Sequence, residues 1–195
     1  MPIQLTPSFA NRLEHSPRAL MGVWVCSGSP LVAEICAGSG LDWMLVDMEH
    51  SPNGLKGVLA QLQAVAPYPV TTVVRVPSND TVAIKQVLDL GAQNIIVPMV
   101  SDASQARSAA EAMLYPPHGR RGVGSALARS GRWNRVPGYL TDAAQHVSLM
   151  CRWSLRRPWR MPRKWPPWRA STASSWARRT WPRRWACWAS RTIPT

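Results

Sequence analysis

A histidine beside two carboxylates is the first candidate for chemistry in this sequence. His50 follows Glu49 directly and lies three residues after Asp47, in the run DMEHSP that comes after the apolar segment WMLV. A neighbouring carboxylate can orient an imidazole and raise its basicity, so His50 could act as a general base near neutral pH, with Asp47 and Glu49 in support. The alternative is a histidine exposed in a loop with no catalytic role.

Arg75 is the second candidate, because it stands within the apolar run TVVRVP. A buried guanidinium is costly unless an anion pairs with it. Its planar fork can bind a carboxylate through two parallel hydrogen bonds. The anion could belong to a substrate, or Arg75 could form a structural ion pair, for example with Asp47 or Asp89. The sequence leaves both possibilities open.

A loop rich in glycine and arginine, Arg120–Ser125 (RRGVGS), is the third candidate. Backbone N–H groups next to glycines can form a nest that binds an anion. The sequence contains no P-loop motif, and no dinucleotide-binding fingerprint follows its first expected strand. The four cysteines lack the spacing of a metal site, so we expect buried free thiols; they are Cys26, Cys36, Cys151 and Cys187.

The elements that must position these residues alternate along the chain. The apolar patterns predict strands at 22–27, 43–47, 72–76, 94–97 and 147–150, and helices at 30–38, 55–66, 80–90, 102–114 and 140–145. Apolar strands separated by helices pair in parallel, which predicts an α/β fold, either a doubly wound sheet or a (β/α)8 barrel. Both folds keep their chemistry at the carboxyl ends of strands, where His50 and Arg75 come.

The composition divides the chain after residue 150. Residues 151–195 hold 12 of the 23 Lys and Arg, none of the 10 Asp and Glu, and 8 of the 11 Trp. Residues 1–150 are therefore near neutral and long enough for one domain, and their charge gives no reason to expect a nucleic-acid or membrane partner. No apolar run is long enough to span a bilayer and no signal-peptide pattern is present, so we expect a cytoplasmic protein.

Two interpretations of residues 151–195 differ in kind. The segment could be a disordered basic arm whose Trp and Arg bind nucleic acid or an anionic membrane. Alternatively, it could be translated out of frame. Tryptophan has a single codon, and a frame that starts one base earlier turns each Trp into an aliphatic residue followed by a small or acidic one. With suitable synonymous codons, residues 151–154 become V-Q-V-E and residues 175–181 become V-G-P-A-D-L, and we favour this interpretation.

Three segments resemble one enzyme family. The segments WMLVDMEHSPN, VVRVPSNDTVAIKQVLDLGAQNIIVPMV and YPPHGRRGVGSALARSGRWNRVPGYL are similar to the HpcH/HpaI aldolases, which are class II pyruvate aldolases. The resemblance runs from about Gly22 to Met150. It implies a (β/α)8 TIM barrel of the phosphoenolpyruvate/pyruvate type, of which residues 1–150 are the N-terminal half and residues 151–195 an aberrant tail. It also implies a homo-oligomer, usually a hexamer, with a role in the catabolism of aromatic compounds.

The same resemblance implies residue roles. The reaction would cleave a 4-hydroxy-2-oxo acid to pyruvate and an aldehyde, with His50 as the general base, Asp89 supporting its basicity and Arg75 stabilising the pyruvate enolate. A divalent metal, Mg²⁺, Mn²⁺ or Co²⁺, would be held by a glutamate and an aspartate. This chain has Ser154 and Thr180 in their places, and the shifted frame would restore both acids. We therefore expect the translated chain to have little or no activity.

Overall fold

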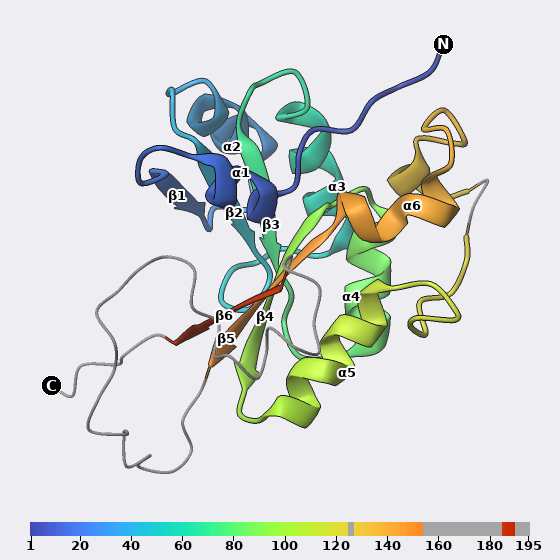
Figure 1. Ribbon diagram of the computed structural model, residues 1–195. Coiled ribbons are helices and arrows are strands. Elements are labelled where there is room, and N and C mark those ends of the chain that lie inside the picture. Colours follow the sequence, from blue (N-terminus) through green and yellow to red (C-terminus); the bar gives the residue numbers. More distant parts are fainter. Residues whose placement is uncertain (125–126, 154–184, 190–195) are drawn as a thin grey trace, which may run out of the picture.

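Strands and helices alternate in the computed structural model, which describes residues 1–124, 127–153 and the backbone of 185–189 (Figure 1). The strands are β1 (Gly22–Val25), β2 (Trp43–Asp47), β3 (Thr71–Arg75), β4 (Asn94–Val100), β5 (Ser148–Trp153) and β6 (Trp185–Ala189). The helices are α1 (Phe9–His15), α2 (Pro30–Ala37), α3 (Leu55–Ala64), α4 (Thr81–Asp89), α5 (Ala103–Met113) and α6 (Tyr139–His146), with a 3₁₀ turn, η1 (Arg129–Gly131). These elements confirm the predicted α/β class.

The sheet has six parallel strands in the order β1-β2-β3-β4-β5-β6. Each strand pairs with the next one along the chain, and the order never reverses. A doubly wound sheet reverses at a switch point, whereas a barrel keeps sequential order, so the topology favours the barrel of the two predicted folds. In the β2–β3 register, Asp47 lies opposite Arg75. The carboxyl ends of these two strands therefore bring the first two candidates together.

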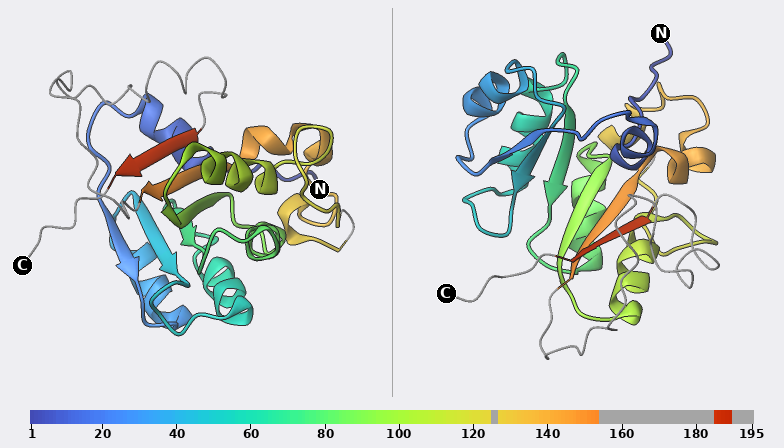
Figure 2. Two further views of the ribbon diagram at one scale, coloured as in Figure 1. Left: turned by 90° about the horizontal axis from the view of Figure 1, so that it is seen from below. Right: turned by 60° about the vertical axis from the view of Figure 1, so that its left-hand side comes forward.

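Two layers of apolar side chains cover the two faces of the sheet. Helices α2 to α5 follow one face (Figure 2) and enclose the larger core, which includes Val46, Val74 and Ile95. On the opposite face, Leu45, Val73 and Met150 pack with Phe9 of α1. This alternation within a strand is why neighbouring residues such as Leu45 and Val46 serve different layers.

Helix α1 was not expected from the sequence. Its Phe9 N–H donates to the Asn94 side-chain Oδ1 at 2.7 Å, and the same oxygen accepts from the Ser148 hydroxyl at 2.8 Å. Asn94 and Ser148 are the first residues of β4 and β5. Helix α1 is thus fixed across the amino ends of these strands, away from the candidate residues.

Helix α4 begins and ends where its sequence predicts. The Asp80 side chain accepts a hydrogen bond from the Ala83 N–H at 2.8 Å, as an N-cap does. Gly91, just past the helix, has a φ of 95°, a conformation that costs a residue with a Cβ free energy. Because α4 runs back from the carboxyl end of β3 to the amino end of β4, its last residue, Asp89, lies at the amino end of the sheet.

Some expectations need correction. Strand β4 continues beyond residue 97 through a bulge that puts Met99 at a positive φ, and β5 continues to Trp153. Residues 185–189, within the tail that was expected to be disordered, pair with β5 as a sheet strand, and the disorder of the rest of the tail stays a prediction. This pairing uses backbone groups, which any sequence supplies. The remaining tail residues, 154–184 and 190–195, lie outside the described residues.

The thiols and the helices give two further results. Cys26 is exposed and Cys36 partly exposed, so the expectation of buried thiols is confirmed only for Cys151. Cys26 comes directly after β1, and its Sγ lies 3.9 Å from Asp47 Oδ2 at the carboxyl edge of the sheet. Among the described helices, none combines the length and apolar character needed to cross a membrane.

Candidate active site

A buried ion pair joins the carboxyl ends of β2 and β3. The Arg75 Nε donates to Asp47 Oδ1 at 2.8 Å, and the Arg75 Nη2 donates to Asp47 Oδ2 at 2.6 Å. The exposed fractions of the two residues are 2% and 1%. The expected need of Arg75 for an anion is therefore met within the chain, by Asp47 and not by Asp89.

Glu49 supplies a second carboxylate to the same guanidinium. Its Oε2 lies 2.6 Å from Arg75 Nη1, and Arg152 of β5 approaches that oxygen with its Nη1 at 3.7 Å. Of the five N–H groups of Arg75, two donate to Asp47, whereas Glu49 Oε2 lies at ion-pair distance and makes no hydrogen bond. The N–H groups that do not bond Asp47 are on Nη1 and Nη2. Trp24 of β1 stacks on the guanidinium at 4.5 Å, so one face of Arg75 is shielded by an indole ring.

The electrostatics of this cluster keep its groups charged. Burial alone would raise the pKa of Asp47, but hydrogen bonds from Arg75 and from the Glu49 and His50 backbone N–H groups lower it below its ordinary value. Burial alone would likewise lower the pKa of Arg75, yet the carboxylates of Asp47 and Glu49 raise it. Arg75 is thus a permanent cation held in a fixed orientation.

His50 lies at the rim of this cluster. Its side chain is 68% exposed, and its Nε2 is 3.5 Å from Glu49 Oε1. The structure therefore brings together four predicted residues, Asp47, Glu49, His50 and Arg75, at the carboxyl edge of the sheet. An exposed imidazole next to a buried cation can exchange a proton with a ligand bound above Arg75.

Asp89 lies apart from these four residues. At the far end of α4, its carboxylate accepts a hydrogen bond from Arg121 Nη2 at 2.8 Å. Among the described residues, no interaction joins Asp89 to His50. Arg121 is buried and stacks on the Tyr115 ring at 4.6 Å. The catalytic role of Asp89 stays a prediction. The expected anion nest at 120–125 also stays one, since Arg121 is committed to Asp89 and Ser125 is outside the described residues.

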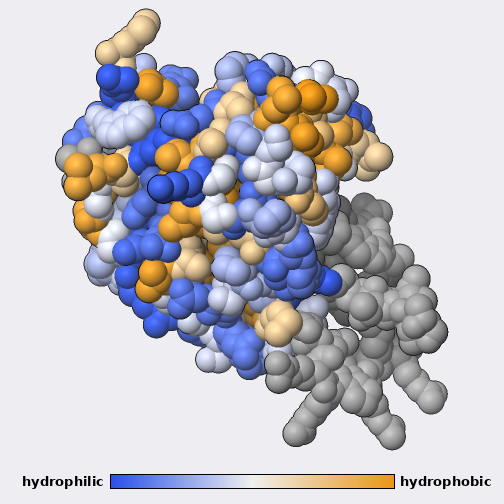
Figure 3. All heavy atoms as spheres, turned by 180° about the vertical axis from the view of Figure 1, so that it is seen from behind, coloured by the Kyte–Doolittle hydropathy of each residue, from blue (hydrophilic) through white to orange (hydrophobic). Residues whose placement is uncertain are grey.

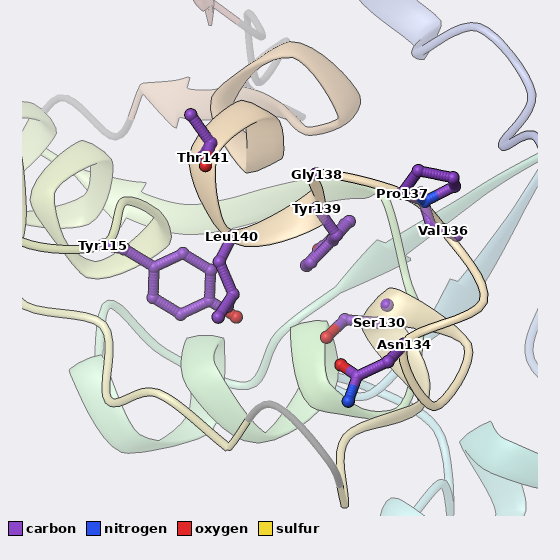
Figure 4. Close-up of a pocket in the computed structure, with 10 residues that line it drawn as sticks. Tyr115, Ser130, Asn134, Val136, Pro137, Gly138, Tyr139, Leu140 and Thr141 are labelled. Carbon is purple, nitrogen blue, oxygen red and sulfur yellow. The ribbon is translucent and has the colours of Figure 1, made fainter.

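A small cavity of about 220 Å³ lies elsewhere, between η1 and α6 (Figure 4). Tyr115, Ser130, Asn134 and Tyr139 are among the residues that line it. No predicted site residue does so. Since α6 leads into the amino end of β5, this cavity is remote from the carboxyl edge, and the cluster around Arg75 is the better candidate for the active site.

The described residues do not by themselves fit a divalent metal. Within this part of the chain, no group of three or more His, Cys, Asp or Glu side chains converges on one point. At the carboxyl edge, both Asp47 oxygens accept from Arg75, whereas the buried Glu49 Oε2 makes no hydrogen bond and faces the cations Arg75 and Arg152. The positions at which the resemblance puts the metal ligands, 154 and 180, lie outside the described residues.

The sequential parallel sheet, with charged side chains at its carboxyl edge, is the architecture of the TIM-barrel class. The chain belongs to the HpcH/HpaI aldolase/citrate lyase family, whose family model matches residues 20–152. This finding confirms the family and the fold that the three sequence segments predicted.

Relatives with assigned names agree with this membership. The chain is 52% identical over 152 residues to a hydroxypyruvate/pyruvate aldolase of Deinococcus radiodurans, a match that covers 76% of this chain and 54% of that protein. It is 53% identical over 133 residues to a 4-hydroxy-2-oxo-heptane-1,7-dioate aldolase of Escherichia coli, covering 68% of this chain and 51% of that one. The chain thus spans about half the length of these relatives.

A solved structure supports the fold as well. A crystal structure of an HpcH/HpaI aldolase/citrate lyase family protein from Burkholderia cenocepacia J2315 superposes with a TM-score of 0.70 at 33% identity. The match covers 73% of this chain and 58% of that one.

Sequence reasoning missed some members of the site. Trp24 and Arg152 reach Arg75 and Glu49 from β1 and β5, and only the strand pairing reveals this. The position of Trp24 at the end of an apolar strand was a usable signal, because such positions face the site in parallel α/β folds. Asn53 was passed over too, although it lies three residues after His50 and its amide reaches the Asp47 carbonyl at 2.6 Å.

Proposed function

We propose that residues 1–150 are the N-terminal part of a pyruvate aldolase, a carbon–carbon lyase that cleaves 4-hydroxy-2-oxo acids to pyruvate and an aldehyde. The names of the relatives in Deinococcus radiodurans and Escherichia coli support this class of reaction. The observation that carries the proposal is that the fixed cation of Arg75 and the exposed His50 contact the same carboxylate, Glu49, at the carboxyl edge of the sheet.

In this proposal His50 is the general base. It takes the proton of the 4-hydroxyl group, the O–H electron pair becomes the carbonyl bond of the aldehyde, and the C3–C4 bond breaks. The electron pair of that bond passes into the enolate of pyruvate, which then takes a proton at C3. The exposure of the imidazole and its contact with Glu49 suit a base that must meet a ligand and keep its orientation.

Arg75 stabilises the enolate. The N–H groups that Arg75 does not donate to Asp47 can donate to the oxygen on which negative charge develops. The carboxylates hold the guanidinium still, so little reorganisation is needed as that charge forms. The indole of Trp24 excludes water from one face of the guanidinium.

The described residues do not provide a site for the divalent metal that the resemblance implies. The sequence has Ser154 and Thr180 where the resemblance places acidic ligands. Neutral hydroxyls are poorer ligands for hard cations than carboxylates. We therefore propose that the chain, as translated, has little or no aldolase activity.

Pyruvate release tests this proposal. The purified chain would be supplied with a 4-hydroxy-2-oxo acid and with Mg²⁺, Mn²⁺ or Co²⁺ in turn, and pyruvate would be measured through lactate dehydrogenase. We expect no release above background from the translated chain and clear release from a protein expressed with the reading frame restored. Metal-dependent release of pyruvate from the translated chain would contradict the proposed inactivity. If the restored protein released no pyruvate, the proposed reaction would be contradicted.

A frameshift near residue 150 accounts for the missing ligands. The composition changes after Met150, and the family match ends at residue 152. Sequencing the DNA across the codons for Leu149 to Trp153 is the direct test. An extra or missing base would support a full-length aldolase. A confirmed frame would instead leave His50 and Arg75 as remnants of a site that no longer holds a metal.

The basic tail carries a second candidate function, binding to nucleic acid or anionic membrane. The observation in its favour is the density of charge and indole groups in residues 151–195. Such binding would weaken steeply with salt and disappear when these residues are deleted. If binding were absent or insensitive to salt, this second function would be contradicted and the aldolase proposal would remain.

We further propose that the frame-restored protein is a cytoplasmic homo-oligomer, a hexamer by the family resemblance. Multi-angle light scattering after size-exclusion chromatography would measure its mass. A monomeric restored protein would contradict this proposal without touching the proposed chemistry.

A further inference from the structure

The turn that carries Glu49 and His50 closes back on Asp47. The Asp47 backbone carbonyl accepts hydrogen bonds from the Ser51 hydroxyl and from Asn53 Nδ2, the latter at 2.6 Å. The Asp47 side chain accepts the Glu49 backbone N–H at 2.9 Å. Both the main chain and the side chain of Asp47 therefore define the turn from which His50 projects.

Asn53 is the residue that ties this turn to the helical layer. It is 8% exposed, and its Oδ1 accepts from Gln61 Nε2 of α3 at 2.7 Å. Gly57 and Gly28 lie beside that oxygen, since a Cβ added at either would be in ordinary van der Waals contact with it, at 3.5 or 3.6 Å. The amide of Asn53 thus occupies a close-fitting position with both of its polar ends engaged.

Gln61 is fully buried, and only its amide nitrogen is satisfied. Its Nε2 donates to Asn53 and to the Gly57 carbonyl, whereas its Oε1 is buried with no hydrogen-bond partner. An unpaired buried oxygen costs free energy, so an apolar side chain of this length would serve packing alone at least as well. The contribution of Gln61 that packing does not explain is the hydrogen bond to Asn53.

We propose that Asn53 and Gln61 are positioning residues for His50. Gln61 fixes Asn53 from α3, Asn53 fixes the Asp47 carbonyl, and the turn then presents His50 beside Arg75. The hydrogen bonds of these two positioning residues go to the Asp47 and Gly57 carbonyls, to the Ser51 hydroxyl and to each other, so their action is on geometry. The catalytic meaning of this relay rests on the proposed aldolase function, whereas the geometry can be measured in the chain without any activity.

The test compares two matched asparagines in the full chain. Asn53→Asp keeps the shape but removes the donor to the Asp47 carbonyl. Asn94→Asp makes the same change at the opposite end of the sheet, where Asn94 Nδ2 donates to the Thr72 carbonyl at 2.9 Å. Amide hydrogen exchange and the imidazole NMR signals of His50 are recorded for both variants, and Gln61→Met serves as a second variant that keeps the side-chain length.

We expect Asn53→Asp to speed amide exchange at Glu49 and His50 by about tenfold or more and to shift or broaden the His50 signals. Gln61→Met should act at the same residues with a smaller effect. Amides in the middle of β2 and β3 should not change in either variant, and Asn94→Asp should leave Glu49 and His50 within about twofold of the original rates.

Equal effects of Asn53→Asp and Asn94→Asp at His50 would overturn the proposal, as would unchanged exchange in both Asn53→Asp and Gln61→Met. If Asn53→Asp unfolds the chain, the amide exchange at Glu49 and His50 in Gln61→Met decides whether the proposal stands. Pyruvate release by the frame-restored protein tests the aldolase function separately, so a failure there leaves the exchange result intact.

Discussion

At the scale of single residues, the main feature is a cation that the protein has neutralised before any ligand arrives. Arg75 is enclosed by Asp47, Glu49 and Trp24, and its hydrogen bonds to Asp47 leave further N–H groups on Nη1 and Nη2. A guanidinium held in this way contributes orientation as well as charge. The cost is that either carboxylate becomes indispensable to the fold, because removing it leaves a buried charge partly unpaired.

Asp47→Asn should reveal this dependence through pH. At neutral pH we expect the variant to lose about 3 kcal/mol of unfolding free energy, since Arg75 loses its main charged partner. The lowered pKa of Asp47 means that its contribution is complete above about pH 4, the value for an unfolded aspartate, and fades as the pH falls through the folded value.

Urea unfolding of the two proteins between pH 7 and pH 2.5 measures this difference. The gap in stability should narrow only below about pH 4. A gap that is constant down to pH 2.5 would show that the charge of Asp47 does not carry the effect.

At the scale of elements, local patterns predicted β2 and the start of α4 well. The β2 residues WMLVD form a strand with the predicted bounds, and Asp80 caps α4 as its position before an apolar helical pattern implies. The predictions that failed depend on distant partners. Helix α1 is held by Asn94 and Ser148, and its own sequence has little to mark it.

In the candidate site, too, local sequence patterns predicted some residues, whereas contacts between distant residues could not be predicted. His50 and Arg75 could be found because their types and strand-end positions are unusual in themselves. Asp89 illustrates what sequence could not supply, because its partner Arg121 is 32 residues away along the chain and the direction of α4 places both at the amino end of the sheet. The Gln61 amide was equally hidden, since its spacing in α3 is that of an ordinary core position.

Gly91→Ala should be costly at the end of α4. Its φ of 95° disfavours a Cβ, and that atom would lie 2.5 Å from Arg132 Nη1 and 2.8 Å from Arg129 Nη1. Gly40→Ala is a matched control, because Gly40 has a φ of 82° with no atom within 4 Å of its added Cβ. The two Nη1 groups end flexible side chains but donate to the Leu90 and Arg129 carbonyls, so we expect Gly91→Ala to lower the unfolding free energy by about 1 kcal/mol more than Gly40→Ala through the loss of these hydrogen bonds.

Chemical denaturation of both alanine variants provides the comparison. Similar losses would mean that the arginine side chains move aside freely and that only backbone conformation matters.

At the scale of the whole molecule, the described sheet is an open segment with β1 at one edge. Helix α2 beside that edge exposes Leu31 by 66% and Ile35 by 65%, one turn apart on one face. On the reverse side of the molecule, apolar residues gather over the end that carries α2 (Figure 3). Exposed apolar groups of this kind promote association between copies.

Replacing Leu31 and Ile35 together by lysine should therefore reduce self-association of the translated chain. Dynamic light scattering over a range of concentrations would show a smaller mean size for the double variant. Val82→Lys is the control, because Val82 is 54% exposed on α4, away from this face. Equal improvement in the control would mean that added positive charge alone increases solubility.

The strand order has a consequence for synthesis on the ribosome. Because each strand pairs with the one made just before it, the sheet from β1 to β5 can assemble one unit at a time while the chain is being translated. Helix α1 is the exception. It is the first helix to emerge, yet its Phe9 N–H has to wait for Asn94 and its partner Ser148, so the earliest helix docks last. A change of reading frame near residue 150 leaves the sequence of β1 to β4 unaltered, so these four strands can still pair one after another.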